Sequence, residues 1–126
     1  MLFRSDIVIL LVPVTLATTG LVDARFLSQM HDDALLVNAA RGSIVDTEAL
    51  LAELLSGRLR AALDVTDPEP LPAGHPLWSA PGLLLTPHVA GATTQAGQHA
   101  MAIVRKQLAR YAAGEPLLNI VGEQGY

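Results

Sequence analysis

Three residues whose side chains bind anions or move protons each follow a short apolar run, and a fourth lies in the loop after one of them. Arg41 comes soon after "LLVN", Asp64 follows "LRAAL", His88 follows "GLLLTP", and Glu69 lies in the proline-rich stretch after Asp64. An arginine holds a carboxylate through two parallel hydrogen bonds. A histidine transfers protons near neutral pH when a nearby carboxylate holds its ring. If the apolar runs are parallel strands, these side chains meet around a crevice at one sheet edge.

Each of the four residues also has a purely structural interpretation, which the residue types leave open. Arg41 can be an exposed side chain on a turn, and Asp64 can accept backbone N–H groups at a strand end. Glu69, between two prolines, can be a solvated loop residue, and His88, after a proline, can belong to a turn. Spacing alone does not choose between these interpretations.

The residues around them predict a parallel sheet flanked by helices. Strands are expected at four apolar runs, residues 6–12, 34–39, 59–65 and 82–87. The first, second and fourth are almost continuously apolar, which is typical of strands that helices cover on both faces. Asp23 and Asp46 can cap helices over 24–30 and 47–56, and Gly57 is expected to end the second. This order of strands and helices predicts two β-α-β units with right-handed crossovers.

The third connection and the C-terminal region differ from the first two connections. Residues 66–81 contain five prolines and no helical period, which predicts a long loop of functional importance. A long helix is expected from Thr93 or Thr94 to Gly114. Its apolar residues form one stripe: Ala96, Ala100, Ile103, Val104, Leu108 and Tyr111.

Composition excludes several classes of function. The net charge of −4 argues against nucleic acid as a partner, and the lack of cysteine excludes thiol catalysis. The lack of cysteine also fits a reducing compartment such as the cytoplasm. The first twenty residues partly imitate a signal peptide, but Asp6 and Pro13 favour a buried strand, too short to span a membrane. The histidines lack zinc-ligand spacing, so no metal site is expected.

Three motifs in order resemble the D-isomer-specific 2-hydroxyacid dehydrogenase family. They are "VNAARGSIVD" with Arg41, "LDVTDPEPLPAGHPLW" with Asp64 and Glu69, and "LLLTPHVAGAT" with His88. "SDIVILLVPVTLATTGLVDARFLSQM" resembles the stretch before the arginine motif. The resemblance covers nearly the whole chain, and it implies NAD(P)-dependent hydride transfer between a D-2-hydroxy acid and its 2-keto acid. Thr66 departs from the family, in which an aromatic residue is commoner.

The resemblance also implies a role for each matching residue. Arg41 matches the arginine that holds the substrate's carboxylate and carbonyl, His88 the acid/base, and Glu69 its carboxylate partner. Asp64 matches the residue that reaches the nicotinamide end of the cofactor. The implied cofactor-binding residues are Val12, Pro13, Thr18, Ala39, Ala40, Arg41, Asp64, His88, Val89, Ala90 and Gly91.

Two parts of such a dehydrogenase have no counterpart in the sequence. There is no G-x-G-x-x-G turn for the pyrophosphate, and the substrate domain is missing. We therefore interpret residues 1–126 as the nicotinamide half of a Rossmann-type NAD(P)-binding domain. Residues 93–126 are expected to form a helix and tail that lead back toward the substrate domain. The chain alone is expected to be inactive, and its uncovered apolar surface favours a homodimer.

A second class of function stays open. The same family includes the C-terminal-binding-protein corepressors, in which the dehydrogenase fold serves protein interaction, and they share the residues that match Arg41, Glu69 and His88. The chain is therefore either part of an enzyme or a non-catalytic interaction module. The sequence identifies neither the 2-hydroxy acid nor the choice between NAD and NADP.

Overall fold

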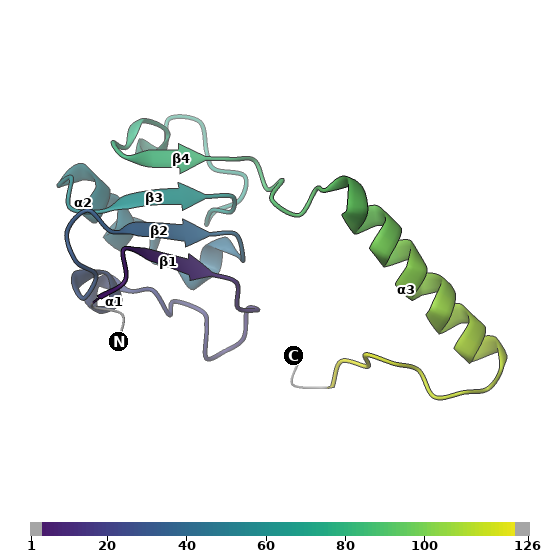
Figure 1. Cartoon of the computed structure of the whole chain (residues 1–126). Coiled ribbons are helices and arrows are strands. Elements are labelled where there is room, and N and C mark those ends of the chain that lie inside the picture. Colours follow the sequence, from purple (N-terminus) through teal and green to yellow (C-terminus); the bar gives the residue numbers. More distant parts are fainter. Residues whose placement is uncertain (1–3, 123–126) are drawn as a thin grey trace. The chain divides into compact units, whose positions relative to one another are not determined.

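The computed structural model describes residues 4–122 of the chain (Figure 1). These residues fall into two compact units, one that ends at Val89 and one that begins at Ala90, and each is described by itself. The first residues of the expected domain, 1–3, and the end of the expected tail, 123–126, lie outside the described residues.

The first unit is built on a sheet of four parallel strands in the order β1-β2-β3-β4 (Figure 1). They are β1 (Ile7–Leu10), β2 (Leu35–Asn38), β3 (Arg60–Leu63) and β4 (Leu83–Leu85). The predicted strands are confirmed, although each is shorter than its apolar run. Pairing sets the limit, because Leu10, Asn38 and Leu63 align in register and the chain turns away after them. All four carboxyl ends therefore lie at one edge.

Two helices follow the first two strands, and their predicted caps are confirmed. Asp23 accepts a hydrogen bond from Phe26 N at 2.7 Å at the start of α1 (Ala24–Ser28). Asp46 accepts one from Ala49 N at 3.0 Å at the start of α2 (Thr47–Leu55). Such caps satisfy backbone donors that lack a partner in the first turn. Gly57 follows α2 with a left-handed φ of 73°, which a glycine adopts without steric cost.

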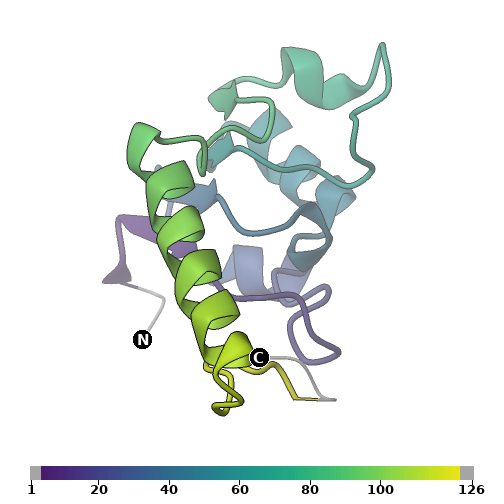
Figure 2. The ribbon, with the colours of Figure 1, turned by 90° about the vertical axis from the view of Figure 1, so that its right-hand side faces the viewer.

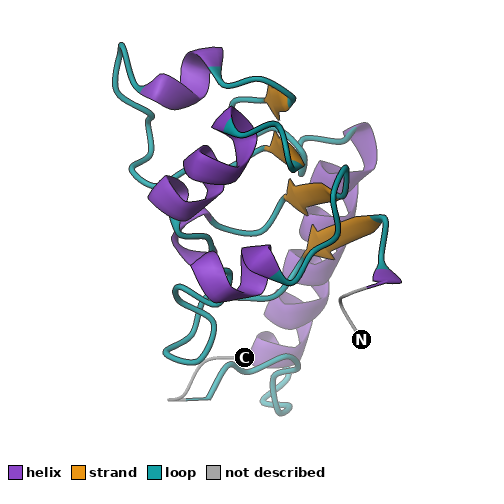
Figure 3. Cartoon of the chain, turned by 90° about the vertical axis from the view of Figure 1, so that its left-hand side faces the viewer, coloured by secondary structure: helices purple, strands orange, loops and turns teal. Residues whose placement is uncertain are grey.

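The helices of this unit lie on one side of the sheet (Figure 3). The core between them and the sheet includes Leu36, Leu27 and Leu54, all fully buried. On the opposite face, the exposed fractions of Ile7, Ile9 and Leu84 are 54%, 58% and 62%. Within the first unit taken by itself, helices therefore cover one face of the sheet, and the prediction that they cover both is not met in this unit. Apolar composition alone does not distinguish a buried face from an apolar face left open.

Arg58 ties the ends of both helices together. Its Nη1 and Nη2 donate to the carbonyl oxygens of Met30 and Leu27, each at 2.7 Å, just after and within α1. Its Nε donates to Glu53 Oε2 in α2, also at 2.7 Å. This hydrogen bond lowers the pKa of the Glu53 carboxyl, against the opposing effect of burial, and raises the pKa of Arg58.

The second unit contains one long helix, α3 (Thr94–Ala112), which begins at an N-cap formed by Thr93 (Figure 2). The predicted helix is confirmed, and Gly114 follows it with a φ of 68°. The segment after the helix folds back on it, because Arg110 Nε donates to Pro116 O at 2.7 Å and Leu118 N donates to Gln107 Oε1 at 3.0 Å. Among residues 4–122, no helix has the length and apolar character needed to cross a membrane.

The Glu53–Arg58 pair makes the stability of the first unit depend on pH. Because the pKa of Glu53 lies lower in the folded chain than in the unfolded chain, the pair stabilises fully above about pH 5. This contribution is lost as the pH falls below about 4.3. We expect Glu53→Gln to lower the free energy of unfolding by about 1 kcal/mol at pH 7 and by less at pH 3.

Urea denaturation of both proteins at the two pH values measures this difference. Glu48→Gln, which removes an exposed carboxylate from the first turn of α2, is the matched control and should show a smaller difference. An equal loss for Glu53→Gln at both pH values would contradict the assigned role of the charge.

Candidate active site

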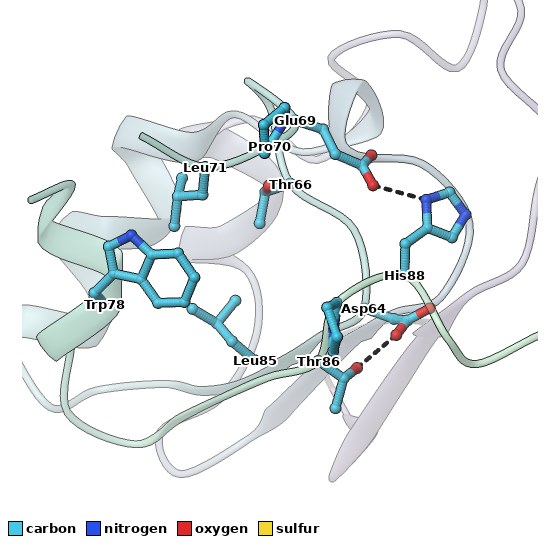
Figure 4. Close-up of a pocket in the computed structure, with 10 residues that line it drawn as sticks. Asp64, Thr66, Glu69, Pro70, Leu71, Trp78, Leu85, Thr86 and His88 are labelled. Atoms are coloured by element: carbon cyan, nitrogen blue, oxygen red, sulfur yellow. Dashed lines mark hydrogen bonds and ion pairs between the residues drawn. The ribbon is translucent and has the colours of Figure 1, made fainter. Parts of the chain in front are cut away.

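A pocket of about 390 Å³ opens beside the carboxyl ends of β3 and β4 (Figure 4). Its volume is within the range of small-molecule sites, and its wall is mostly apolar with a few polar groups, as in such sites. The loop after β3 and the residues around the end of β4 supply the wall. The lining residues are Asp64, Thr66, Glu69, Pro70, Leu71, Trp78, Leu85, Thr86, Pro87 and His88.

Glu69 and His88 form a hydrogen-bonded pair at one side of this pocket. The distance from His88 Nδ1 to Glu69 Oε1 is 2.7 Å, and the exposed fractions of the two side chains are 47% and 39%. The second ring nitrogen of His88 points away from Glu69 (Figure 4). A carboxylate on Nδ1 fixes the ring and the proton on that nitrogen, which leaves Nε2 to exchange a proton with another molecule. The structure thus joins two of the four residues that the sequence singled out.

The backbone of His88 is held in a sparsely populated conformation. Its φ is 54°, in the left-handed region, which costs a residue other than glycine on the order of 1 kcal/mol or more. His88 N donates to Asp64 O at 2.8 Å, and the next amide, Val89 N, donates to Asp64 Oδ1 at 2.8 Å. These contacts hold the turn that directs the ring toward Glu69.

Asp64 is buried and joins the ends of two neighbouring strands. Besides Val89 N, its Oδ1 accepts a hydrogen bond from Thr86 Oγ1 at 2.5 Å (Figure 4). The structural interpretation of Asp64, a carboxylate that satisfies donors at a strand end, therefore describes these contacts. Its implied role at the nicotinamide end of a cofactor stays a prediction. Sequence reasoning missed Thr86, although "TPH" contains a hydroxyl two residues before the histidine.

Arg41 occupies the turn after β2 but does not line the pocket. The buried Asn38 amide closes this turn: its Nδ2 donates to Arg41 O at 2.9 Å, and its Oδ1 accepts from Ala40 N at 3.0 Å. The guanidinium is exposed, and its Nη1 donates to Ala40 O at 2.6 Å. Asp64, Glu69 and His88 therefore line this pocket together, while Arg41 lies along its own turn. The predicted crevice shared by all four side chains stays a prediction.

Gly42, the residue after Arg41, packs against the loop that carries Glu69. A Cβ at this position would lie 1.9 Å from Thr66 O and 2.6 Å from Asp67 N, so only glycine fits. Thr47 Oγ1 at the start of α2 donates to Asp67 O at 2.8 Å and holds the same loop. Sequence reasoning missed both residues; the dipeptide Arg41–Gly42 was the available signal for a close backbone approach.

The remaining implied cofactor residues lie in turns at the same sheet edge, or in the second unit. Val12 and Pro13 are exposed after β1, and the Thr18 hydroxyl donates to Pro13 O at 2.7 Å and accepts from Thr15 N at 2.7 Å. After β2, Ala39 is half-buried and Ala40 is buried. Val89 ends the first unit, and Ala90 and Gly91 begin the second. Their contact with a cofactor stays a prediction.

Trp78 has a different place from the one its sequence context suggests. An indole in the proline-rich loop is expected to pack beneath that loop, yet Trp78 is exposed and forms the far wall of the pocket (Figure 4). Its Nε1 donates to Pro72 O at 2.9 Å, and a short 3-10 helix, η3 (Pro76–Ser79), carries it. The loop thus contains one helical turn that its prolines did not predict.

The comparison with protein families identifies the fold around this site. The family described as "D-isomer specific 2-hydroxyacid dehydrogenase, NAD binding domain" matches residues 1–90 of the sequence. The chain belongs to this family. The predicted resemblance and the parallel Rossmann-type fold are both confirmed.

Relatives in the dehydrogenase family are similar over almost the whole chain. Glyoxylate/hydroxypyruvate reductase A of Escherichia fergusonii is 41% identical over 125 residues, which cover 98% of this chain and 39% of that protein. A D-isomer specific 2-hydroxyacid dehydrogenase from Xanthobacter autotrophicus Py2, solved with NADPH and MES, has a TM-score of 0.86 and 41% identity, over 96% of this chain and 50% of that chain.

An NAD-dependent formate dehydrogenase from Staphylococcus aureus, solved in complex with NAD, has a TM-score of 0.78 and 37% identity, over 94% of this chain and 37% of that chain. The chain spans 34% to 39% of the length of the first curated relatives that it matches. The dehydrogenase fold around Glu69 and His88 is thus shared, while the whole proteins are longer than this sequence.

Gly42→Ala tests the contact that positions the Glu69 loop. The added methyl group meets backbone atoms that cannot rotate away, so we expect a loss of about 2 kcal/mol or more in the free energy of unfolding. Gly97→Ala is the matched control, because a Cβ at Gly97 in α3 meets nothing within 4 Å. It should be neutral or slightly stabilising. Urea denaturation measures both, and equal effects would contradict the close-packing argument.

Proposed function

We propose that this chain supplies the proton-transfer and substrate-anchoring groups of an NAD(P)-dependent D-2-hydroxyacid dehydrogenase. The observation that carries the proposal is the 2.7 Å hydrogen bond between His88 Nδ1 and Glu69 Oε1 at a pocket beside the strand ends. Membership of the dehydrogenase family supports the assignment of that pair to 2-keto acid chemistry rather than to stability alone.

Each residue of the proposed site has one chemical task. His88 Nε2 gives a proton to the keto oxygen during reduction and takes it back from the hydroxyl during oxidation. Glu69 holds the ring and its Nδ1 proton through the hydrogen bond. The side chain of Arg41, in the turn after β2, rotates away from that turn and binds the substrate carboxylate through two hydrogen bonds.

A nicotinamide cofactor supplies or accepts the hydride when it is bound. The turns after β1 and β2 fit such a group, because Ala39 and Ala40 place only small side chains at the sheet edge and Val12 is exposed beside them. Relatives solved with NADPH and with NAD support a dinucleotide in this family. We propose NAD for this chain, with NADP as the alternative.

We propose the following context for this site. The substrate is a small 2-hydroxy or 2-keto acid, and residues 93–126 lead back toward a substrate domain. We further propose a homodimer in the cytoplasm, in which the apolar sheet face and the stripe on α3 do not remain exposed.

His88→Asn tests the proton-transfer role in the protein expressed from the complete open reading frame that encodes this chain. We expect kcat for 2-keto acid reduction to fall about 10²- to 10⁴-fold, because general acid catalysis is lost while the side-chain volume is nearly kept. Steady-state kinetics on glyoxylate, hydroxypyruvate and other 2-keto acids provide the measurement.

His99→Asn, an exposed position on α3, is the control and should keep the unmodified rate. A rate for His88→Asn within threefold of the unmodified protein refutes its proposed role. If the unmodified protein turns over no 2-keto acid on the panel, the interaction-module alternative replaces the enzyme.

Arg41→Ala tests the carboxylate contact in the same protein. The loss of a charge-assisted hydrogen bond of about 1.5–3 kcal/mol should lower kcat/KM about 10- to 100-fold. Arg41→Lys should recover only part of the loss, because an ammonium cannot form the paired contact. Arg25→Ala on the exposed surface of α1 is the control. Unchanged kinetics for Arg41→Ala would assign carboxylate binding to another residue.

A further inference from the structure

Three of the hydrogen bonds that Asp64 accepts come from the four-residue segment 86–89. The donors are His88 N to Asp64 O at 2.8 Å, Val89 N to Asp64 Oδ1 at 2.8 Å, and Thr86 Oγ1 to Asp64 Oδ1 at 2.5 Å. They come from both sides of His88, the residue with the left-handed backbone. Asp64 therefore fixes the segment before, at and after the histidine.

The Thr86 hydroxyl gives the Asp64 carboxyl group a donor from the residue after β4. Thr86 N already donates to Leu63 O, where β4 pairs with β3, and Pro87 has no N–H group. The Thr86 hydroxyl is therefore the donor on the strand side that keeps Asp64 Oδ1 turned toward Val89 N. The distance of 2.5 Å between Thr86 Oγ1 and the buried Asp64 Oδ1 is that of a short hydrogen bond between two oxygen atoms.

We propose that Thr86 is a positioning residue for the acid/base pair. Its hydroxyl orients the Asp64 carboxylate, the carboxylate fixes the Val89 amide, and the left-handed turn so formed points His88 Nδ1 at Glu69. The claim that this geometry serves catalysis rests on the proposed function. The geometry itself is testable in the present chain without turnover.

Thr86→Val is the main test, because valine keeps the shape of threonine and removes the hydroxyl. In the 126-residue chain we expect the Val89 amide to exchange with solvent at least tenfold faster. We also expect the low-field proton signal of the hydrogen-bonded His88 Nδ1–H to weaken or disappear. Exchange of the amides in β2 should change less than threefold, which shows that the sheet stays folded.

Thr86→Ser is the matched control, since it keeps the hydroxyl and loses only a methyl group. It should keep both the slow Val89 amide and the Nδ1–H signal. Unmodified exchange and signal in Thr86→Val would overturn the proposal, as would equal losses in the valine and serine variants, because then the methyl group and not the hydroxyl is responsible.

Asp64→Asn tests the contact between the carboxylate and the Val89 amide if Thr86→Val does not fold. The amide keeps an acceptor oxygen of the same size without the charge, so the Val89 amide should exchange about three- to tenfold faster and the Nδ1–H signal should broaden. An unchanged Val89 amide in a folded Asp64→Asn protein overturns the proposal.

These measurements separate the inference from the proposed function. A protein from the complete open reading frame that reduces no 2-keto acid refutes the function but leaves the exchange data and their interpretation intact. Conversely, a normal Val89 amide in Thr86→Val refutes the positioning role even when His88→Asn abolishes turnover.

Discussion

The contact between the backbone of Gly42 and the peptide that joins Thr66 to Asp67 is the constraint on which the site depends. It brings the turn that carries Arg41 against the loop that carries Glu69, although the two are far apart in the sequence. The Thr47 hydroxyl holds the same loop from the start of α2. The loop, so fixed, sets Glu69 at the distance that His88 requires, and the parallel register of the strands supplies the common edge.

Elements with local signals were predictable from the sequence. Asp23, Asp46 and Thr93 precede helical patterns and cap them, because capping depends on a side chain and a backbone amide three residues on. The continuous apolar runs likewise predicted strands. They did not predict the open face with Ile7 and Ile9, since a run that is apolar at every position does not say which face a neighbour covers.

The site was predictable in its residues but not in its contacts. The motifs pointed to Glu69 and His88 as partners, and the structure brings them together. The direction of the Arg41 guanidinium depends on rotamers and on nearby carbonyl groups, which no spacing encodes. The contacts of Asp64 with Thr86 and Val89 depend on the left-handed turn at His88, a backbone state that a histidine seldom adopts and that sequence patterns do not indicate.

The proline-rich loop supplies two parts of the pocket wall, and different contacts hold each part in place. Glu69 stands between Pro68 and Pro70, which restrict the backbone on either side. Farther along, His75 accepts from Leu77 N and Trp78 donates to Pro72 O, so the outer part of the loop is held by its own hydrogen bonds. Substitutions near Trp78 can therefore reshape the pocket while the hydrogen bond between Glu69 and His88 keeps its geometry. During evolution, the outer part of the loop can therefore change to admit new ligands without altering the contact between Glu69 and His88.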